Sequence, residues 1–280
     1  MAVIGIDLGT TNSLAGVWQD GKVVLIPNAF GEYLTPSVVG IGKNQEVFVG
    51  SVAKEMLATQ PYDTFREFKR NMGTNFLYGN GRKKYRAEEL SAFVLRRLKE
   101  DAEKFLGEEV TEAVISVPAY FDDNKRNATK NAGRLAGLKV ERLINEPSAV
   151  ALKHHTAEKG AESFIVFDFG GGTLDVSLVE AFDNVVEIQA VAGDNYLGGK
   201  DFNEIIAQDF YEQNQISEAY LTKNEQENVL KEAEAVKKEL TDKNEAERQV
   251  YIKGEAYTLK MTNQRLIHLS AELFSRMAKP

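Results

Sequence analysis

The order of the predicted elements along the chain indicates an α/β fold. Apolar runs that suit strands alternate with segments whose apolar residues recur at helical spacing. Two of the strand pairs share one type of turn, in which Asp-x-Gly is followed by small polar residues or further glycines. A length of 280 residues is enough for two domains, each with a core of its own. We therefore expect an α/β protein of two domains.

In the first half of the chain, turn and cap signals mark where elements begin and end. Asp20-Gly21 predicts a hairpin between strands 14–18 and 23–26. Ser51 is a plausible N-cap for a helix over 51–60. Further strands are expected at 36–41, 47–50, 112–118 and 140–144, and further helices at 87–105, 124–136 and 148–155. The glycine-rich and basic segment 75–86 is expected to be a loop.

The second half is organised around the stretch 164–179. Residues 164–167 form an uninterrupted apolar run, which predicts a buried strand, and three glycines follow Asp168. Residues 174–178 alternate between apolar and polar, as in a half-buried strand. The elements expected after it are a strand at 185–192, a loop at 193–199, helices at 201–213, 222–240 and 262–277, and a hairpin at 249–261.

Composition excludes several classes of protein. A net charge of −8 argues against nonspecific nucleic-acid binding, because no basic stripe is present. The absence of cysteine excludes disulfides, zinc–thiolate sites and thiol catalysis. Only three histidines occur, which disfavours a histidine metal site or a serine–histidine triad. No signal peptide and no segment of membrane-spanning length is visible, so we expect a cytoplasmic protein without a membrane partner.

The two Asp-x-Gly turns, at Asp7 and Asp168, predict a site for a polyphosphate. Glycines lack a Cβ, so their backbone N–H groups can close on phosphate oxygens. The carboxylates would repel phosphate and are better suited to a hydrated Mg²⁺, which keeps its waters and needs one or two carboxylates. The alternative is a pair of ordinary glycine-turn hairpins.

Five segments, in order along the chain, resemble the ATPase domain of the DnaK-type heat-shock chaperone family. They are residues 4–13, 114–122, 142–149, 167–177 and 193–202. The resemblance implies an actin- and sugar-kinase-like fold of two lobes, each with a mixed sheet and flanking helices. Lobe I is expected over 1–157, with an outer subdomain at about 37–87. Lobe II is expected over 158–280, with an outer subdomain at about 198–270.

The resemblance also assigns roles to single residues. Asp7 and Asp168 match the aspartates that hold Mg²⁺ through waters. The matches to the first phosphate loop are Gly9, Thr10, Thr11 and Asn12, and those to the second are Gly170, Gly171, Gly172 and Thr173. Lys69 matches the catalytic lysine, and Glu146 and Asp175 match the acids near the attacking water; with Asp168 and Thr173 they make up the expected catalytic set.

Further assignments concern the adenosine and the coupling to a substrate domain. Glu234, Lys237, Lys238 and Thr241 resemble the adenosine clamp, and their spacing places them on one helix face. Without the resemblance, that face would be interpreted as a solvated surface. Gly198 and Gly199 match a loop that approaches the nucleotide. Pro118 and Arg126 resemble the pair that relays nucleotide state through Glu146.

The sequence also departs from the family pattern. The short segment 75–86 lacks an expected hairpin, as in the HscC-like branch, which puts standard contacts with an exchange factor in doubt. Lys238 stands where many members have arginine or an apolar residue, and Lys200 replaces an acid. The chain stops at Pro280, before the family's second adenosine loop and its peptide-binding domain. We expect a fragment cut inside lobe II, with weak or absent nucleotide affinity and a tendency to self-associate.

The function implied is ATP hydrolysis in a molecular chaperone that couples nucleotide state to the binding of unfolded peptides. The implied cofactors are ATP or ADP and Mg²⁺, with K⁺ as an additional cation. The implied partners are unfolded peptides, a J-domain co-chaperone and a nucleotide-exchange factor. A small-molecule kinase of the same fold is the alternative, although the segments 114–122 and 193–202 speak against it. An actin-like filament protein is a third possibility, but no feature of the sequence indicates a polymer interface.

Overall fold

The structure is a computed structural model that describes residues 2–79, 83–154, 160–183 and 185–280. Contacts between residues divide the chain into two units. The first unit comprises Met1–Glu55, Tyr62–Asp168 and Asp175–Ala192. The second comprises Met56–Pro61, Phe169–Leu174 and Gly193–Pro280.

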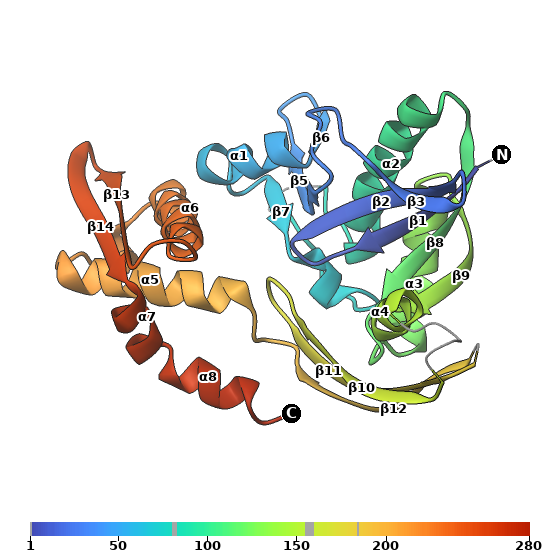
Figure 1. Ribbon diagram of the computed structural model, residues 1–280. Helices are drawn as coiled ribbons and strands as arrows, with labels where there is room; N and C mark the ends of the chain where they lie inside the picture. Colours follow the sequence, from blue (N-terminus) through green and yellow to red (C-terminus); the bar gives the residue numbers. More distant parts are fainter. Residues whose placement is uncertain (1, 80–82, 155–159, 184) are drawn as a thin grey trace. The chain divides into compact units, whose positions relative to one another are not determined.

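The main sheet of the first unit has six strands in the order β3-β2-β1-β8-β9, with β4 paired to β2. β1 runs antiparallel to β2 and parallel to β8, and β8 runs parallel to β9 (Figure 1). The strands are β1 Ala2–Leu8, β2 Asn12–Gln19, β3 Lys22–Ile26, β4 Thr35–Pro36, β8 Val110–Val117 and β9 Lys139–Asn145. The predicted hairpin at Asp20-Gly21 is confirmed, and both residues have positive φ.

Helices α2 (Ala87–Leu106) and α3 (Asp123–Leu135) pack against each other and supply much of the first core. In α2 the buried residues Leu90, Val94 and Leu98 recur every four positions, so one face of the helix is apolar. Alternate residues of β1, among them Ile4 and Ile6, are buried in the same core. The predicted helices at 87–105 and 124–136 are therefore confirmed.

A second sheet of the first unit, in the order β6-β5-β7, has shorter strands. They are β5 Val38–Ile41, β6 Val47–Val49 and β7 Thr64–Arg66, and they accompany helix α1 Ser51–Thr59 and the 3-10 helix η1 Phe68–Asn71. The predicted strand 36–41 is interrupted at Ser37, because that residue bonds to a neighbouring loop instead of extending the ladder. The expected N-cap at Ser51 is wrong: the helix begins at that residue, and Gly50 accepts the hydrogen bond from the Lys54 amide.

The predicted loop 75–86 contains one antiparallel bridge that sequence patterns did not indicate. Tyr78 and Tyr85 exchange two backbone hydrogen bonds of 2.8 and 2.9 Å. Both rings also lie against Phe65, with centroids 6.0 Å away. Aromatic packing therefore closes the base of the loop; Arg82, one of its basic residues, lies outside the described part of the chain.

The third sheet has the order β10-β11-β12 and contains the predicted central hairpin. Its strands are β10 Glu162–Phe169, β11 Leu174–Phe182 and β12 Val185–Asp194. The expectation that 164–167 is buried is wrong, because Ile165 is 66% exposed and Phe167 52% exposed. Helix α4 (Glu146–His154) precedes the sheet and starts two residues earlier than predicted, while His155 lies outside the described residues.

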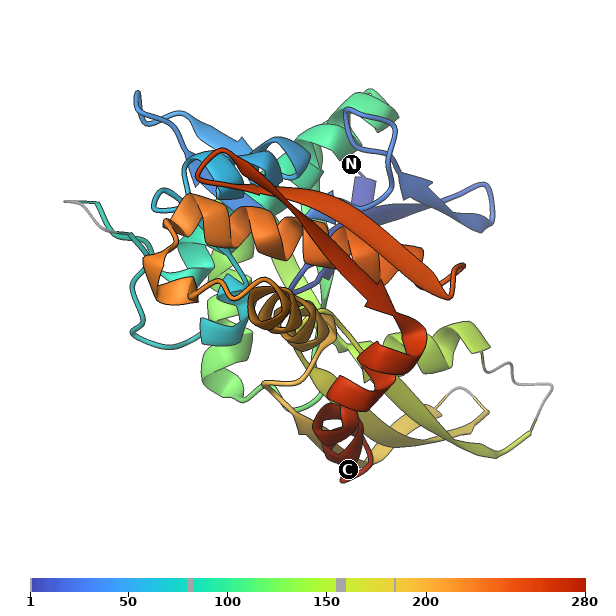
Figure 2. The same ribbon diagram turned by 90° about the vertical axis from the view of Figure 1, so that its left-hand side faces the viewer.

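The second unit packs helices against one long hairpin. Its elements are α5 Gly199–Gln213, the 3-10 helix η3 Glu218–Tyr220, α6 Lys223–Glu239, β13 Glu245–Ile252, β14 Glu255–Thr262, α7 Asn263–Leu269 and α8 Ala271–Met277. The β13–β14 hairpin lies across α6 (Figure 2) and buries Val250 and Leu259 in the second core. The capping box of Thr222 and Glu225 at the start of α6 is confirmed.

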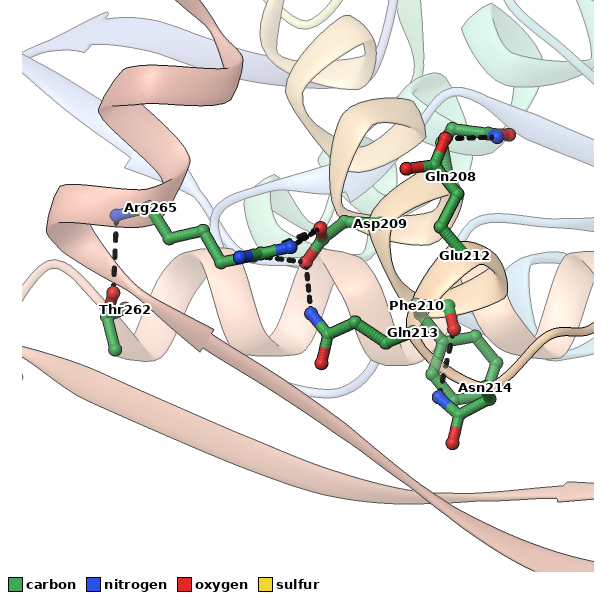
Figure 3. A network of polar contacts seen from close by, with 8 residues as sticks. All are labelled: Gln208, Asp209, Phe210, Glu212, Gln213, Asn214, Thr262 and Arg265. Atoms are coloured by element: carbon green, nitrogen blue, oxygen red, sulfur yellow. Dashed lines mark hydrogen bonds and ion pairs between the residues drawn. The ribbon is translucent and has the colours of Figure 1, made fainter.

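The predicted helix 262–277 is divided at Ser270 into α7 and α8. Ser270 is completely buried and ends α7, and its carbonyl accepts the Phe274 amide of α8. Arg265 of α7 bonds to Asp209 of α5 (Figure 3), which holds α7 against α5. The two short helices have different neighbours: α7 contacts α5 and β14, whereas α8 contacts Phe202 and Asp194.

The α/β class predicted from the sequence is confirmed by several sheets with flanking helices. Throughout the ranges that the structure describes, no helix is both long enough and apolar enough to cross a bilayer.

Candidate active site

A cluster of acids around one buried lysine forms the centre of the site in the first unit. Lys69 Nζ lies 2.9 Å from Glu146 Oε1, and the two side chains are only 8% and 18% exposed. The charges of Asp7 and Asp168 act on Glu146, and those of Glu146 and Asp168 act on Asp175. Five predicted site residues therefore lie close together, although they come from distant parts of the sequence.

Lys69 is fixed by local structure that its own sequence pattern did not indicate. It lies in η1, and that short helix begins directly after Glu67. Glu67 has a left-handed backbone (φ 57°), so the chain changes direction there between β7 and η1. Its neighbour Phe68 is buried in the first core and anchors the short helix. The Lys69 ammonium lies 5.8 Å from the centre of the Phe121 ring, within the range of a cation–π contact.

Burial and mutual repulsion raise the pKa values of the acids. Burial is the largest cause for Asp175, followed by the charges of Glu146 and Asp168, and together they raise its pKa to about 7. Burial also raises the pKa of Glu146, against the opposing effect of Lys69. Loss of surrounding water and the charge of Asp7 raise the pKa of Asp168, although the residue as a whole is exposed.

Asp7 stands at the end of β1, beside Ser116 of the parallel strand β8. The Ser116 hydroxyl donates to Asp7 Oδ1 at 2.8 Å and leaves the rest of the exposed carboxylate available. Sequence analysis did not single out Ser116. One sequence signal could have indicated Ser116. It lies directly before Val117-Pro118, near the end of a strand parallel to β1, and parallel strands end at the same sheet edge.

The first predicted phosphate loop consists of Gly9, Thr10, Thr11 and Asn12, and it is a tight turn between β1 and β2. A Cβ on Gly9 would lie 2.1 Å from the carbonyl oxygen of Asn12, so no larger residue fits. Buried Ser37 supports the loop from below: its hydroxyl donates to Gly9 O at 2.7 Å, and its amide donates to Thr11 O at 2.8 Å. Sequence analysis missed Ser37, which is 28 residues from Gly9 in the chain.

The second predicted phosphate turn belongs to the second unit, together with Gly198 and Gly199. Gly170 N donates to Thr173 O at 3.0 Å, which closes the turn. Gly199 N donates to Gly170 O at 3.0 Å, and Lys200 N donates to Gly171 O at 2.9 Å. A Cβ on Gly198 would lie 2.3 Å from Gly172 N, so glycine at position 198 is needed for this close backbone approach.

The four residues predicted to form an adenosine clamp differ in their contacts and in their position relative to α6. Lys237 Nζ donates to the Gly199 carbonyl at 2.5 Å, so this lysine contacts the segment behind the phosphate turn. Lys238 is 67% exposed and pairs with Glu234 at 2.7 Å, one helical turn away. α6 ends at Glu239, so Thr241 lies in the turn that follows the helix and not on its face.

The pair predicted to couple the site to another domain lies beside β9. Pro118 is buried at the end of β8. Arg126 of α3 donates to the Phe121 carbonyl at 2.8 Å and to the Asn145 side chain at 2.7 Å. Asn145 immediately precedes Glu146, so Arg126 contacts the backbone neighbour of the buried acid.

Tyr120 is a further residue of the site that sequence analysis missed. Burial raises the pKa of its hydroxyl well above the usual range, and the charges of Asp175, Glu146 and Asp168 add to that effect. Its hydroxyl therefore stays neutral and can donate a hydrogen bond in the acidic cluster.

The site fits a hydrated magnesium ion better than a protein-built metal cage. The charge of Asp7 raises the pKa of Asp168, which places these two carboxylates near each other in the first unit. Within the described part of the chain, no group of three or more acidic or histidine side chains is arranged to hold a metal by itself. Two carboxylates suit Mg²⁺, which keeps several waters and completes its shell with substrate phosphates.

Comparison with protein-family models gives a match over most of the chain. A sequence model described as Hsp70 protein matches residues 3–80 and 77–280, which together extend over nearly the whole chain.

Proposed function

Because this chain belongs to the Hsp70 protein family, we propose that it is the ATP-hydrolysing domain of a DnaK-type chaperone of the HscC-like branch. Membership of the family makes it a chaperone ATPase domain with an actin-like fold that binds nucleotide with Mg²⁺. The short segment 75–86 supports the assignment to the branch. The observation that supports the catalytic assignment best is the 2.9 Å pair of Lys69 and Glu146, buried beside two further acids.

In this proposal Asp175 is the general base for the attacking water. A base is most effective when its pKa lies near the operating pH, and the pKa of Asp175 is about 7. Glu146 holds one of the three N–H donors of Lys69, which leaves two that can reach a γ-phosphate oxygen. A lysine in that position neutralises the negative charge of the transition state.

The remaining predicted residues bind and orient the nucleotide. Two segments are proposed to offer backbone and hydroxyl donors to phosphate: Gly9, Thr10, Thr11 and Asn12, and residues 170–173. Glu234, Lys237 and Lys238 are proposed to contact the adenosine, with Thr241 at the helix end. When bound, Mg²⁺ would be held through waters by Asp7 and Asp168 and would neutralise phosphate charge. K⁺ stays a prediction without support from a described contact.

The organisation and partners of the protein are also proposals. Lobe I is assigned to 1–157 and lobe II to 158–280; this boundary falls on residues outside the described part of the chain. Proteins of the family generally bind unfolded peptides and J-domain co-chaperones, and we propose the same partners here, with Pro118 and Arg126 transmitting nucleotide state. A nucleotide-exchange factor and a cytoplasmic location complete the proposal.

Lys69→Ala tests the proposed chemistry. We expect its turnover of ATP to fall by roughly 100-fold or more, because the transition state loses a positive charge, while the Kd for ATP stays within about threefold. Lys99→Ala is the matched control, since Lys99 also pairs with a glutamate, Glu103, at 2.8 Å, but within helix α2. Single-turnover hydrolysis and isothermal calorimetry give the two quantities. Unchanged turnover in Lys69→Ala would remove this lysine from the mechanism, and phosphoryl transfer to an added sugar would favour the kinase alternative.

A further inference from the structure

The phosphate turn of the second unit depends on its neighbours for its shape. Between Phe169 and Leu174 only Thr173 has a polar side chain, and three glycines leave the backbone free to adopt many conformations. The amides of Gly199 and Lys200 bind the carbonyls of Gly170 and Gly171 and so fix the turn from behind. The position of residues 198–200 therefore decides where the N–H groups of the turn point.

Residues 194–198 in turn are held by one arginine of α8. Arg276 Nη2 donates to Asp194 Oδ2 at 2.7 Å and to the Tyr196 carbonyl at 2.9 Å, and Arg276 Nε donates to Asp194 Oδ2 at 3.1 Å. Asp194 Oδ1 accepts the Tyr196 amide at 2.9 Å. The guanidinium thus ties together a side chain and a carbonyl two residues apart, which sets the curvature of the segment that leads to Gly198.

The burial of this segment and of the ion pair shows that the pair is more than a loose surface interaction. Leu197, between Tyr196 and Gly198, is completely buried. The carboxylate of Asp194 and the guanidinium of Arg276 are 27% and 29% exposed, so water screens the pair only in part. Partial burial alone would raise the pKa of Asp194, but the hydrogen bonds from Arg276 and the Tyr196 amide lower it.

An aromatic chain connects α8 to the same turn by a second route. The Phe274 ring of α8 lies 5.6 Å from that of Phe202 in α5, and Phe202 lies 6.2 Å from Phe169. Phe169 is the residue at which the phosphate turn begins. α8 therefore contacts one end of the turn through rings packed edge to face, and it contacts the segment behind the turn through Arg276 and residues 194–200.

We propose that Arg276 is a positioning residue for phosphate binding and that α8 preorganises the phosphate turn. Backbone N–H groups bind an anion well only when they already point at it, because ordering a glycine turn on binding costs conformational entropy. This inference rests on the proposed function for its ligand, a nucleoside polyphosphate. Its structural part, the ordering of residues 170–173 and 198–200 by Arg276, holds with or without nucleotide.

Hydrogen exchange in the nucleotide-free chain tests the structural part. In Arg276→Met we expect the amides of Gly199 and Lys200 to exchange at least about tenfold faster, because a charge-assisted pair that restrains them is lost. Arg265→Met is the matched control: it removes another arginine–aspartate pair of the same unit, Arg265–Asp209, that does not contact this segment. Equal protection of both amides in wild type, Arg276→Met and Arg265→Met would overturn the proposal.

Ligand binding tests the functional part. Calorimetry should show ATP affinity reduced about fivefold in Arg276→Met while affinity for adenosine, which has no phosphate, is unchanged. Equal losses for ATP and adenosine would indicate general destabilisation and contradict a phosphate-specific role. A wild-type chain that binds neither ligand would refute nucleotide binding by this chain, and the exchange result would still decide the role of Arg276. If Arg276→Met does not fold, Asp194→Asn weakens the same pair, and Arg276→Lys, which keeps the charge but not the fork of donors, should rescue part of the protection.

Discussion

At the scale of single residues, the first phosphate loop is defined by a steric limit. Gly9 cannot accept a Cβ, which would meet the Asn12 carbonyl oxygen at 2.1 Å. Gly5 lies in β1, the strand that leads into this loop, and a Cβ there would have its nearest neighbour at 3.9 Å. A side chain is therefore sterically excluded at Gly9 but not at Gly5, although the two glycines are only four residues apart.

We expect Gly9→Ala to destabilise the chain by about 1–3 kcal/mol, because the backbone of the loop must move to remove the overlap. Gly5→Ala should change the free energy of unfolding by less than about 1 kcal/mol. Urea unfolding of both variants measures the difference. Equal stability of the two variants would show that the loop at Gly9 relaxes freely.

Asp175 gives the site a dependence on pH. Its pKa is about 7 in the folded chain and 3.8 for an ordinary aspartate, so between these values the folded state binds the extra proton. This carboxyl contributes stability that is fully present below about pH 4 and is lost as the pH rises through 7. At pH 8 its buried negative charge opposes folding.

Asp175→Asn should therefore melt at a higher temperature than wild type at pH 8, by at least about 2 °C, and the gain should vanish toward pH 4. Glu180→Gln, on the same strand β11, is a control that should show no such trend. Thermal melts from pH 4 to 8 provide the test. A constant difference across this range would contradict the raised pKa of Asp175.

At the scale of elements, the short helix α7 is held in place by a polar network (Figure 3). Asp209 of α5 is 2% exposed and accepts from Arg265 Nε and from Gln213 Nε2. The Thr262 hydroxyl caps α7 by accepting the Arg265 amide at 3.2 Å. A buried carboxylate without its arginine would retain only the amide of Gln213 as a partner from this network.

Arg265→Met should lower the midpoint of urea unfolding, because Asp209, whose side chain is 2% exposed, loses its charged partner. The arginine is 49% exposed, so the effect should be smaller than for a fully buried pair. Gln208→Met, on the exposed part of α5 beside Glu212, is the control and should change the free energy of unfolding by less than about 0.5 kcal/mol. Adding Asp209→Leu to Arg265→Met should recover part of the loss. Failure of the double variant to recover any stability would show that Arg265 acts through packing and not through charge.

At the scale of the whole molecule, the sheet β10-β11-β12 leaves large apolar side chains exposed. They include Ile165, Phe167, Leu178, Phe182, Val185 and Val191. β10 also lies at the edge of its sheet, so its backbone can pair with another strand. An exposed edge with apolar side chains favours association between copies of the chain.

We expect the chain to self-associate as its concentration rises, and Ile165→Lys to reduce this association. Tyr220→Lys is the control, since Tyr220 is 78% exposed but belongs to η3 and not to this sheet. Light scattering across a concentration series measures the mean mass. A monodisperse monomer at high concentration in wild type would contradict the prediction.

The sequence by itself determined where most helices and strands lie and where the tight turns between them occur. Hairpins at Asp20-Gly21 and Lys253-Gly254, the long helix α2 and the cap at Thr222 all follow from local signals, because such turns and caps depend on neighbouring residues. Local patterns also indicated Asp7 and Asp168, whereas the family resemblance was needed to assign Lys69, which lone sequence reasoning would place on the surface.

Only the tertiary structure decided which residues meet and which faces are covered. The supporting hydroxyls of Ser37 and Ser116, and the neutral Tyr120 in the acidic cluster, depend on contacts over long sequence separations. The apolar run at 164–167 predicted a buried strand, and two of its residues proved to be exposed. Periodicity reports which face of an element is apolar, but burial depends on what packs against that face, and this information is spread over the whole chain.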